Sequence, residues 1–210
     1  MKGLLLISSG IDSPVAGYIM IKRGVEIIAV HFNNLKEEDD KSLRTTKRLV
    51  KKLSQIANKR IKLYIIQNHR NQRVIMDNTN RRFQCVLCKR LMYRMAERIA
   101  KKEKCDFLIT GENLGQVASQ TLDNLKVLDD ATDMIVLRPL LCNDKNDTIK
   151  IAKQIGTYDI SIEHKDTCAF VPKRPLTKAK LEKVKVQEEK LDIQKIVDDS
   201  IKNAESVLIS

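Results

Sequence analysis

A short polar segment near the start of the chain has the residue types and the setting of a phosphate-binding loop. The apolar run Leu4–Ile7 leads into the hexapeptide Ser8–Ser13 (Ser-Ser-Gly-Ile-Asp-Ser), and a helical pattern opens at Pro14. This order predicts a buried strand, a tight loop and a helix. Pro14 suits the first helical position because proline has no N–H to lose there. Such a loop directs backbone N–H groups and the positive end of a helix dipole at an anion, so we expect a phosphate site.

Two simpler classes of loop compete with this interpretation. A Walker A loop requires the pattern G-x-x-x-x-G-K-[ST], and no such lysine follows the hexapeptide. An ordinary strand-to-helix turn, capped by Asp12 or Ser13, needs no ligand at all. The hexapeptide alone therefore leaves a nucleotide site and a capped turn both open.

Three of the five cysteines have a spacing that suggests chemistry. Cys85 and Cys88 form a C-x-x-C pair at the start of a predicted helix, and Cys168 follows much later. The chain opens on Met-Lys-Gly directly before the first strand, so we expect no signal peptide and a cytoplasmic location. There, cysteines are more often ligands or catalysts than disulfides. The helix start and the basic residues around it should favour thiolates. Cys105 and Cys142 border predicted strands, and we expect both in the core.

The elements that must position these residues alternate along the chain. Strands are expected at residues 3–8, 25–32, 62–66, 106–110 and 134–137, and helices at 14–23, 42–57, 71–80, 89–104, 116–131 and 144–155. This alternation predicts βαβ units around a parallel sheet, in an α/β fold. Ligands bind at the carboxyl ends of such strands. We therefore expect one rim to gather Ser8–Ser13, His31–Phe32, Gly111–Glu112 and Arg138–Pro139.

The pattern changes after residue 175. Apolar residues at helical spacing punctuate a Lys/Glu-rich segment, which predicts one or two amphipathic helices. We expect them to pack back on the sheet. The predicted division is an α/β domain over residues 1–175 and a C-terminal helical extension over residues 176–210.

The charge of the chain points to a polyanionic partner. The 210 residues carry 39 Lys+Arg against 27 Asp+Glu, a formal net charge of +12. The surplus lies before residue 176, mainly within 36–62 and 81–104. Basic surface beside a nucleotide site predicts a substrate larger than a nucleotide, with RNA as the first candidate, although either segment alone is consistent with a solvated helix face. No apolar run approaches the roughly 20 residues that span a bilayer, so no membrane partner is expected.

Several longer motifs together resemble the pyrophosphatase-loop (PP-loop) domain of tRNA 4-thiouridine synthetases, also called tRNA sulfurtransferases. The family's loop reads S-G-G-x-D-S, and the similarity covers nearly the whole chain. The most specific stretch is Thr110–Thr121. The resemblance also rests on residues 8–18, 22–24, 31–32, 89–92, 137–140, 144–145, 156–168 and 171–173. It implies an α/β, parallel-sheet fold of the adenine nucleotide alpha hydrolase-like (PP-loop) type.

The resemblance implies an activity and roles for individual residues. ATP with Mg²⁺ would adenylate O4 of a uridine in tRNA, and a sulfur nucleophile would then displace AMP to give 4-thiouridine. The implied donors to pyrophosphate are Ser8, Ser9, Gly10 and Ser13. Asp12 would hold magnesium or orient the uridine, and Lys145 would neutralise phosphate charge. The similarity also places Leu6, Ile7, His31, Phe32, Lys89, Gly111 and Gln120 around the nucleotide, although Leu6 and Ile7 equally suit core packing.

The cysteines resemble the three-cysteine iron–sulfur site of several tRNA thiolases. This implies a [4Fe-4S] or [3Fe-4S] cluster on Cys85, Cys88 and Cys168, with sulfur carried on its open iron. A cluster-free cycle of persulfide and disulfide on the same cysteines stays open. Structural zinc is disfavoured because a closed site needs a fourth ligand.

Departures from the family pattern leave other functions open. Ser9 stands where the family has glycine, which is consistent with a nucleotide-binding subunit that has lost catalysis. Another PP-loop ATP-pyrophosphate lyase, acting at a different tRNA position or as an amidotransferase-type synthetase, is the second alternative. Bacterial members carry an RNA-binding THUMP region, and some carry a rhodanese domain. We expect a stand-alone form without either, whose partners are tRNA, a separate THUMP-type protein and a sulfur donor. A homodimer is left open.

Overall fold

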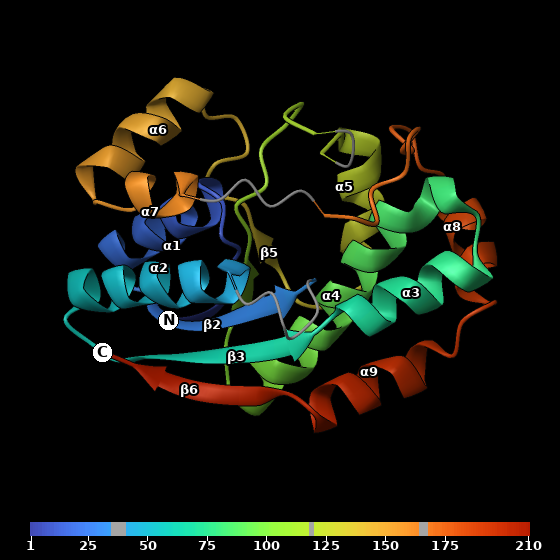
Figure 1. Cartoon of the computed structure of the whole chain (residues 1–210), viewed down its shortest axis with the longest axis horizontal. Coiled ribbons are helices and arrows are strands. Elements are labelled where there is room, and N and C mark those ends of the chain that lie inside the picture. The colour runs from blue at the N-terminus through green and yellow to red at the C-terminus, as the bar shows by residue number, and fades with distance from the viewer. Residues whose placement is uncertain (35–40, 118–119, 164–167) are drawn as a thin grey trace.

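The computed structural model describes residues 1–34, 41–117, 120–163 and 168–210, which are built around a six-stranded sheet of order β5-β4-β1-β2-β3-β6 (Figure 1). The strands are β1 (Lys2–Leu6), β2 (Glu26–Asn33), β3 (Ile61–Gln67), β4 (Phe107–Ile109), β5 (Val136–Leu137) and β6 (Glu205–Ile209). The first five pair in parallel, and β6 runs antiparallel to β3. The predicted α/β class with a mostly parallel sheet is therefore confirmed.

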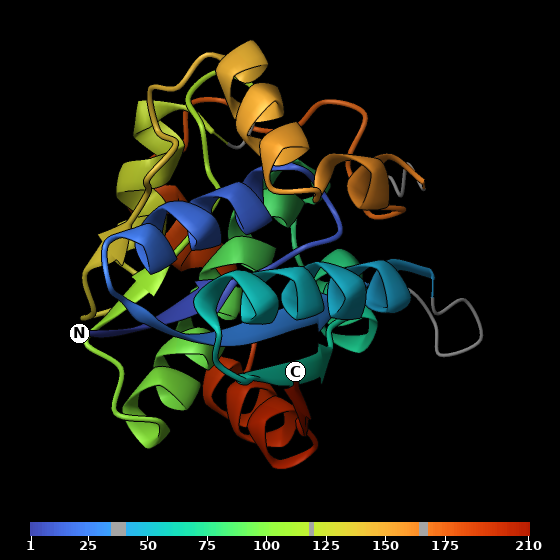
Figure 2. The same cartoon turned by 90° about the vertical axis from the view of Figure 1, so that its left-hand side faces the viewer.

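Helices cover both faces of the sheet, as Figure 2 shows. One face packs against α1 (Asp12–Lys22), α2 (Lys41–Ala57), α6 (Lys145–Gln154) and α7 (Tyr158–Ile162). The other packs against α3 (His69–Asn78), α4 (Gln84–Lys102), α5 (Leu122–Asp129), α8 (Leu181–Glu188) and α9 (Ile193–Lys202), and the short 3₁₀ helix η1 (Arg81–Phe83) leads into α4. Successive strand residues point to opposite faces, so Leu4 and Leu6 enter one core while Leu5 enters the other. This is why β1 is apolar throughout.

The carboxyl ends of β1, β2 and β4 meet at one edge, and a glycine allows the closest approach there. A Cβ on Gly111, just after β4, would lie 2.6 Å from the backbone nitrogen of Ser13. Any side chain at this position would push the β4 end away from the start of α1. Gly111 therefore fixes the distance between the two segments that border the candidate site.

The predicted helix at 116–131 begins later than expected. Gly115 has φ +74°, a left-handed conformation that does not continue a helix, and α5 begins only at Leu122. Thr121 caps it by accepting a hydrogen bond from the Asn124 N–H at 3.3 Å. Residues 118 and 119 of the most specific motif lie outside the described residues. The described residues 116, 117, 120 and 121 are thus outside a helix, and Gln120 lies beside the site.

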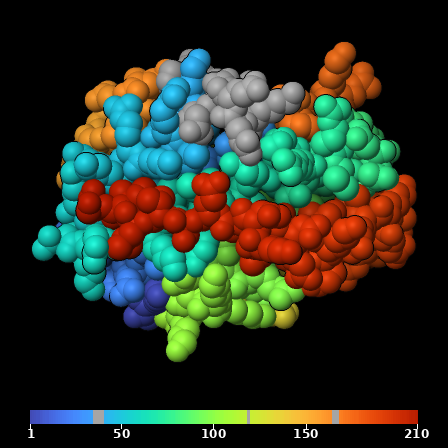
Figure 3. Space-filling view, turned by 60° about the horizontal axis from the view of Figure 1, so that its bottom comes forward, coloured from blue at the N-terminus to red at the C-terminus, as the bar shows by residue number. Residues whose placement is uncertain are grey.

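The segment after residue 175 forms the two expected helices and an unexpected strand. Val184 of α8 and Val197 of α9 belong to the same core as β1 and α4. Strand β6 then pairs with β3 from Ile61–Ile209 to Ile65–Glu205. Figure 3 shows α9 and β6 as a continuous band across the surface. The division of the chain after residue 175 stays a prediction.

A buried ion-pair network fastens α8 to α4. Glu188 accepts hydrogen bonds from Arg90 Nε at 2.9 Å and from Arg94 Nη1 at 2.6 Å, and the Arg90 side chain is almost fully buried. Burial alone would raise the pKa of Glu188, but Arg94 and Arg90 lower it below its ordinary value. The carboxylate is therefore ionised and paired at neutral pH.

Glu188→Ala should destabilise the fold by about 3 kcal/mol, because the buried Arg90 guanidinium loses the carboxylate that binds its Nε and Nη2 and, among the described residues, keeps only Asp130 as an ion-pair partner. Urea unfolding followed by circular dichroism measures this loss. Glu189→Ala, at the exposed neighbouring position, is the matched control and should change stability by less than about 0.5 kcal/mol. The stabilisation should disappear as the pH falls below the unfolded carboxyl pKa of about 4.3, since a lowered folded pKa makes the ionised form the stabilised one. Equal losses in the two variants would contradict the assignment.

Among the described residues, no helix combines the length and the apolar character needed to cross a membrane.

Candidate nucleotide and sulfur site

The loop at residues 8–13 is held closed by two of its own serines. The Ser8 N–H donates to Ser13 Oγ at 2.9 Å, and the two hydroxyl oxygens lie 3.1 Å apart. The Gly10 N–H donates to Ser8 Oγ at 3.3 Å. Helix α1 begins immediately afterwards at Asp12, and its N-cap position is Ile11, which provides no side-chain cap. Neither Asp12 nor Ser13 is therefore the N-cap, so the cap that the simpler turn requires is not formed. A helix start without a side-chain cap is suited to an external anion.

Pro14 occupies a different position from the predicted one. Helix α1 starts at Asp12, so Pro14 is its third residue rather than its first. The difference has no energetic cost, because the N–H groups of the entire first turn lack intrahelical acceptors. The proline still fixes the φ angle where the loop becomes a helix.

The two predicted catalytic residues at the loop are in contact. Lys145 Nζ donates to Asp12 Oδ1 at 2.6 Å and to Gln116 Oε1 at 3.2 Å. Lys145 is the first residue of α6, whose N-cap Asp144 accepts a hydrogen bond from the Asn146 N–H at 2.7 Å. The cap fixes where α6 begins and therefore where the ammonium lies. A cation and a carboxylate thus stand together at the mouth of the loop, accessible to solvent.

A cavity of about 220 Å³ opens beside the loop, between the ends of β1 and β4 and the side of α4. Eight of the predicted nucleotide-site and catalytic residues line it: Leu6, Ser8, Gly10, Asp12, Ser13, Lys89, Gly111 and Gln120. Within the described residues, Gln120 Oε1 is buried there without a hydrogen-bond partner. A buried polar atom facing a cavity without a partner is what a polar ligand such as adenine would satisfy. These residues therefore fit an adenine nucleotide.

The remaining predicted nucleotide residues support the loop from below. Ile7 donates its N–H to Val30 O at 2.9 Å and is buried, and Phe32 is a core residue. His31 is buried, with Nδ1 3.0 Å from Ile7 O and 3.4 Å from Thr46 Oγ1. None of these three residues lines the cavity. Their contact with the nucleotide stays a prediction, whereas Ile7 directly precedes the loop and His31 contacts the carbonyl oxygen of Ile7.

The departure at Ser9 does not strain the loop. Among the described non-glycine residues, only Asn58 and Lys104 have positive φ, so Ser9 adopts a backbone conformation open to any residue. Its hydroxyl accepts a hydrogen bond from Ser42 Oγ at 3.3 Å, at the start of α2. The serine therefore adds a contact to a neighbouring helix.

A buried carboxylate network beneath the cavity was not predicted. Glu112 accepts hydrogen bonds from Lys89 Nζ at 2.8 Å, Tyr93 Oη at 2.7 Å and Arg138 Nε at 3.0 Å. Burial alone would raise the pKa of Glu112, but Lys89, Tyr93 and Arg138 lower it to about 2. The network holds the Lys89 ammonium at the cavity wall. In the sequence, Glu112 and Arg138 both follow predicted strands. This places them at the same rim of the sheet but does not predict that they form an ion pair.

The C-x-x-C pair, Cys85 and Cys88, lies close to Cys168. Cys85 and Cys88 are the second and fifth residues of α4, and the Cys88 sulfur accepts a hydrogen bond from Asn68 Nδ2 at 3.4 Å. The Cys168 sulfur lies 3.4 Å from Gln72 Nε2. The thiols are close enough that Cys168 raises the pKa of both Cys85 and Cys88, and Cys85 raises the pKa of Cys88.

Side-chain amides connect these sulfurs. Asn34 Oδ1 accepts from Asn68 Nδ2 at 2.9 Å and from Gln72 Nε2 at 2.6 Å. The amides that reach Cys88 and Cys168 are therefore joined through one residue at the end of β2. We call Asn34, Asn68 and Gln72 the amide triad. The triad links the Cys88 and Cys168 sulfurs by hydrogen bonds to the end of β2.

Burial governs the thiol pKa values, against expectation. It raises the pKa of Cys88 to about 12, and Cys168 and Cys85 add to the rise. The pKa of Cys85 is also raised, by burial and by Cys168. The prediction that the helix start favours thiolates here is wrong for these two residues, because removal from water outweighs the helix dipole. Of the two cysteines expected in the core, Cys105 is buried, whereas the prediction for Cys142 is wrong because it is exposed.

The three cysteines do not form a ready-made metal site. Within residues 1–34, 41–117, 120–163 and 168–210, no group of three or more His, Cys, Asp or Glu side chains is arranged to hold a metal ion. The thiols provide the donor chemistry of an iron–sulfur cluster without its geometry. The cluster stays a prediction.

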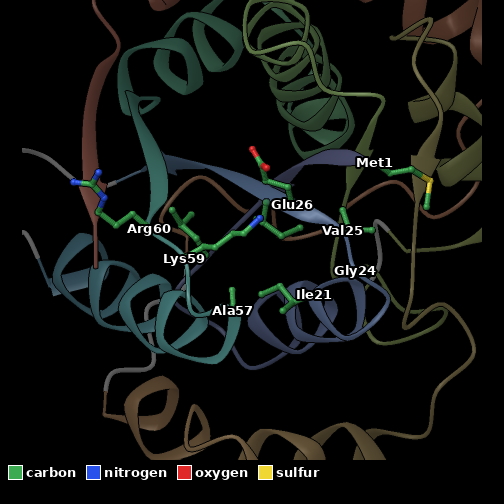
Figure 4. Close-up of a pocket in the computed structure, with 10 residues that line it drawn as sticks. Met1, Ile21, Gly24, Val25, Glu26, Ala57, Lys59 and Arg60 are labelled. Atoms are coloured by element: carbon green, nitrogen blue, oxygen red, sulfur yellow. The ribbon is translucent and has the colours of Figure 1, made fainter.

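Another cavity lies at the opposite end of the sheet. It has a volume of about 280 Å³, and Met1, Gly24, Glu26, Lys59 and Arg60 are among its lining residues (Figure 4). This is the amino end of β2 and β3. Parallel sheets bind ligands at the carboxyl ends of their strands, so this cavity is not the candidate site.

Known proteins resemble the chain over its full extent. The profile of the family described as "Thiamine biosynthesis protein (ThiI)" matches residues 1–193. A protein named "Probable tRNA sulfurtransferase" from Halothermothrix orenii is 45% identical over 208 residues, which are 97% of this chain and 52% of that protein. A protein of the same name from Finegoldia magna is 42% identical, over 99% of this chain and 54% of its own length. The chain therefore spans about half the length of these curated relatives.

One solved structure matches the fold closely. It is described as "Crystal structure of a 4-thiouridine synthetase - RNA complex with bound ATP", and it is 32% identical with a TM-score of 0.93. The match covers 100% of this chain and 55% of that chain. Sequence profile, relatives and structure agree with the resemblance seen in the motifs, and the chain belongs to the ThiI family.

Proposed function

We propose that this chain carries out ATP-dependent thiolation of tRNA, activating a uridine and transferring sulfur to it to form 4-thiouridine. The observation that carries the proposal is the shared rim. The Asp12–Lys145 pair, the cavity with its unsatisfied Gln120 and the three neighbouring thiols all gather at the carboxyl ends of the strands. The similar solved structure, described as holding ATP and RNA, supports the same reading.

The loop and Lys145 would stabilise the charge that develops on phosphate. ATP supplies the adenylyl group that turns a poor leaving group, the uridine oxygen, into a good one. The donors around Ser8 and Gly10 and the uncapped start of α1 would bind the pyrophosphate. The Lys145 ammonium, held by Asp12 beside the loop, would balance the negative charge that increases in the transition state. These groups are already in place, so little reorganisation opposes the reaction.

Asp12 is the residue that would hold Mg²⁺ or orient the uridine. It lines the cavity, and its second carboxylate oxygen is left for another partner when Oδ1 binds Lys145. Magnesium prefers carboxylate and phosphate oxygens and keeps several waters, so one protein carboxylate suffices. Glu112 is a poorer candidate because Lys89, Tyr93 and Arg138 already donate to it.

Cys168 is our candidate for the sulfur-carrying residue. It is half-buried, next to Gln72, and Cys85 lies in the same neighbourhood. In the cluster-free route, the terminal sulfur of a Cys168 persulfide attacks C4 of the activated uridine and AMP leaves. The Cys85 thiol then attacks the Cys168 sulfur, which releases the thiolated base and leaves a disulfide for an external reductant. A [4Fe-4S] or [3Fe-4S] cluster on the three cysteines is the alternative, tested by iron and sulfide analysis after anaerobic purification.

The partners follow from the same proposal. They are tRNA, a sulfur donor and a THUMP-type RNA-binding region, supplied by a separate protein or by a longer form of this chain. A homodimer and a cytoplasmic location are compatible with these partners and stay predictions.

The experiment is an anaerobic, reconstituted reaction with the chain, an unmodified tRNA transcript, ATP, Mg²⁺ and a thiol reductant. Polysulfide, whose sulfur is already at the oxidation level of a persulfide, is the donor for the cluster-free route, and sulfide is the donor for the cluster route. We expect pyrophosphate, AMP and 4-thiouridine in equal amounts, with the nucleoside identified by its near-ultraviolet absorbance and located by mass spectrometry. A thiolated base of another kind would indicate a different tRNA thiolase. An aminated product with ammonia would indicate an amidotransferase-type synthetase. Failure of tRNA to stimulate pyrophosphate release would support the non-catalytic alternative.

Ser9→Gly distinguishes the catalytic and non-catalytic readings of the loop. We expect pyrophosphate release to stay within about threefold of the parent, because Ser9 has no strained backbone and its bond to Ser42 is a single, partly buried hydrogen bond of 3.3 Å. Ser42→Ala removes the same bond from the other side and is the matched control. If the glycine variant gained activity by a hundredfold, serine would be an inactivating substitution and the proposal would fail for the natural chain.

A further inference from the structure

A basic hollow lies on the α8 side of the molecule, away from the nucleotide cavity. It has a volume of about 260 Å³, with Phe83 and Leu176 half-buried in its lining. Its four charged lining residues are Arg82, Lys178, Lys180 and Lys183, all exposed, and none is acidic. We call these residues the basic pocket.

The four cations of the basic pocket have no carboxylate partners among the described residues. Elsewhere on the surface, ion pairs are common: Lys185, on the same helix as Lys183, lies 3.3 Å from Asp130, and Lys150 lies 2.9 Å from Asp147. No such pair involves a pocket residue within the described part of the chain. Four like charges around one hollow repel one another, so an anion bound between them would relieve an unfavourable arrangement.

The start of helix α8 adds to the positive field. Its N-cap is Lys180, whose side chain makes no capping hydrogen bond, and Lys180 and Lys183 at this end of α8 both line the basic pocket. A helix start carries a partial positive charge that favours anions. The basic pocket therefore combines side-chain cations with a helix dipole of the same sign.

The basic pocket is physically tied to the cysteines. Arg82 belongs to η1, which leads directly into the turn of α4 that holds Cys85. The Leu176 N–H donates to Arg82 O at 3.2 Å, which fixes the segment following Cys168 against η1. Three residues span at most about 11 Å, so the backbone of Arg82 is no farther than that from Cys85. An extended polyanion bound here would pass close to the sulfur residues.

We propose that the basic pocket binds phosphodiester groups of the RNA strand and so positions the strand beside Cys85 and Cys168. The proposed function identifies the RNA as tRNA. The assignment of the basic pocket as a phosphate site does not depend on it. Phosphate contacts fix register and orientation without reading sequence, which is the task required of a site that must present one base. Phe83 lines the same hollow, and an aromatic side chain beside a phosphate site suits a neighbouring base, which can stack on it.

The first test maps lysine accessibility on the unmodified chain. Lysines are acetylated with and without an unmodified tRNA transcript and quantified by mass spectrometry. We expect RNA to reduce acetylation of Lys178, Lys180 and Lys183 by at least about threefold, while Lys22 and Lys59, exposed at the amino end of the sheet, stay unchanged. Equal protection of both groups, or none at the pocket lysines, would overturn the proposal.

The second test compares two triple variants in RNA binding. Lys178→Ala/Lys180→Ala/Lys183→Ala removes three of the four cations of the basic pocket, and Lys22→Ala/Arg23→Ala/Lys59→Ala removes the same charge elsewhere. At moderate salt, we expect the pocket variant to bind the transcript at least about tenfold more weakly. The slope of log affinity against log salt concentration should decrease by the equivalent of about one to two phosphate contacts. The control should lose less than about threefold. If both triple variants bound the transcript equally weakly, the loss would be an effect of net charge alone. If the pocket variant bound as tightly as the parent, the pocket would not contact RNA. Either result overturns the proposal.

ATP provides the readout that separates this inference from the proposed function. The pocket variant should keep the ATP-induced rise in melting temperature, because the basic pocket shares no residue with the nucleotide cavity. If the parent forms no 4-thiouridine but only the pocket variant loses RNA affinity, the proposed function fails and the pocket assignment stands. If the parent thiolates tRNA and both triple variants bind it alike, only the pocket assignment fails.

Discussion

Lys145→Ala should reduce tRNA-dependent pyrophosphate release by about 10²–10³-fold, with little change in ATP-induced thermal stabilisation. The ammonium is held against Asp12 at 2.6 Å, at the mouth of the loop, where phosphate charge would increase during adenylation. Its contribution should therefore be larger in the transition state than in the bound substrate. Such a group lowers kcat more than it raises KM when it is removed.

The matched control for this prediction is on the same helix. Lys150→Ala removes another lysine of α6, which is exposed and pairs with Asp147 rather than with Asp12. Its rate should equal that of the parent. A loss shared by both variants would indicate an effect of α6 stability, and a normal rate for Lys145→Ala would remove Lys145 from the mechanism.

Cys168→Ser should abolish formation of 4-thiouridine, by at least about 10³-fold, while pyrophosphate release stays within about threefold. Serine preserves the size of the side chain and its place beside Gln72, but it can carry neither a persulfide nor a cluster iron. Activation of the uridine precedes the sulfur step, so it should continue and give AMP by hydrolysis. Quantifying pyrophosphate and thiolated nucleoside in the same reaction separates the two steps.

An exposed cysteine provides the control for the sulfur step. Cys142→Ser changes a thiol that is exposed and not among those influencing Cys85 and Cys88. It should form 4-thiouridine at the parental rate. Retained thiolation in Cys168→Ser would shift sulfur transfer to Cys85 or to free sulfide, and loss of both products would make Cys168 a structural residue.

The sequence was most informative where local pattern and chain order decide the outcome. The apolar run before Ser8 and the hexapeptide after it predict strand, loop and helix without knowledge of any distant residue. Alternating elements then place the ends of β1, β2 and β4 on one rim, because parallel strands share direction. The meeting of Asp12 and Lys145 followed from family resemblance rather than from spacing, since 133 positions separate them.

What could not be predicted depends on partners that are remote in the chain. Glu112 looks like an ordinary rim carboxylate until Lys89, Tyr93 and Arg138 are brought to it by α4 and β5. The thiol pKa values depend on burial, which overrides the favourable position of Cys88 at a helix start. Strand β6 is five residues long and largely exposed, so its pairing with β3 has no periodic signal of its own.

That antiparallel pairing constrains the order in which the molecule can be built during synthesis. Ile61 and Ile209 are neighbours across the sheet, yet nearly the whole of the intervening chain must leave the ribosome before they can meet. Until then the outer edge of β3 has unpaired backbone N–H and C=O groups, which can pair with a strand of another chain. Nascent chains halted before residue 205 should therefore be prone to aggregation, although most of the core is already present.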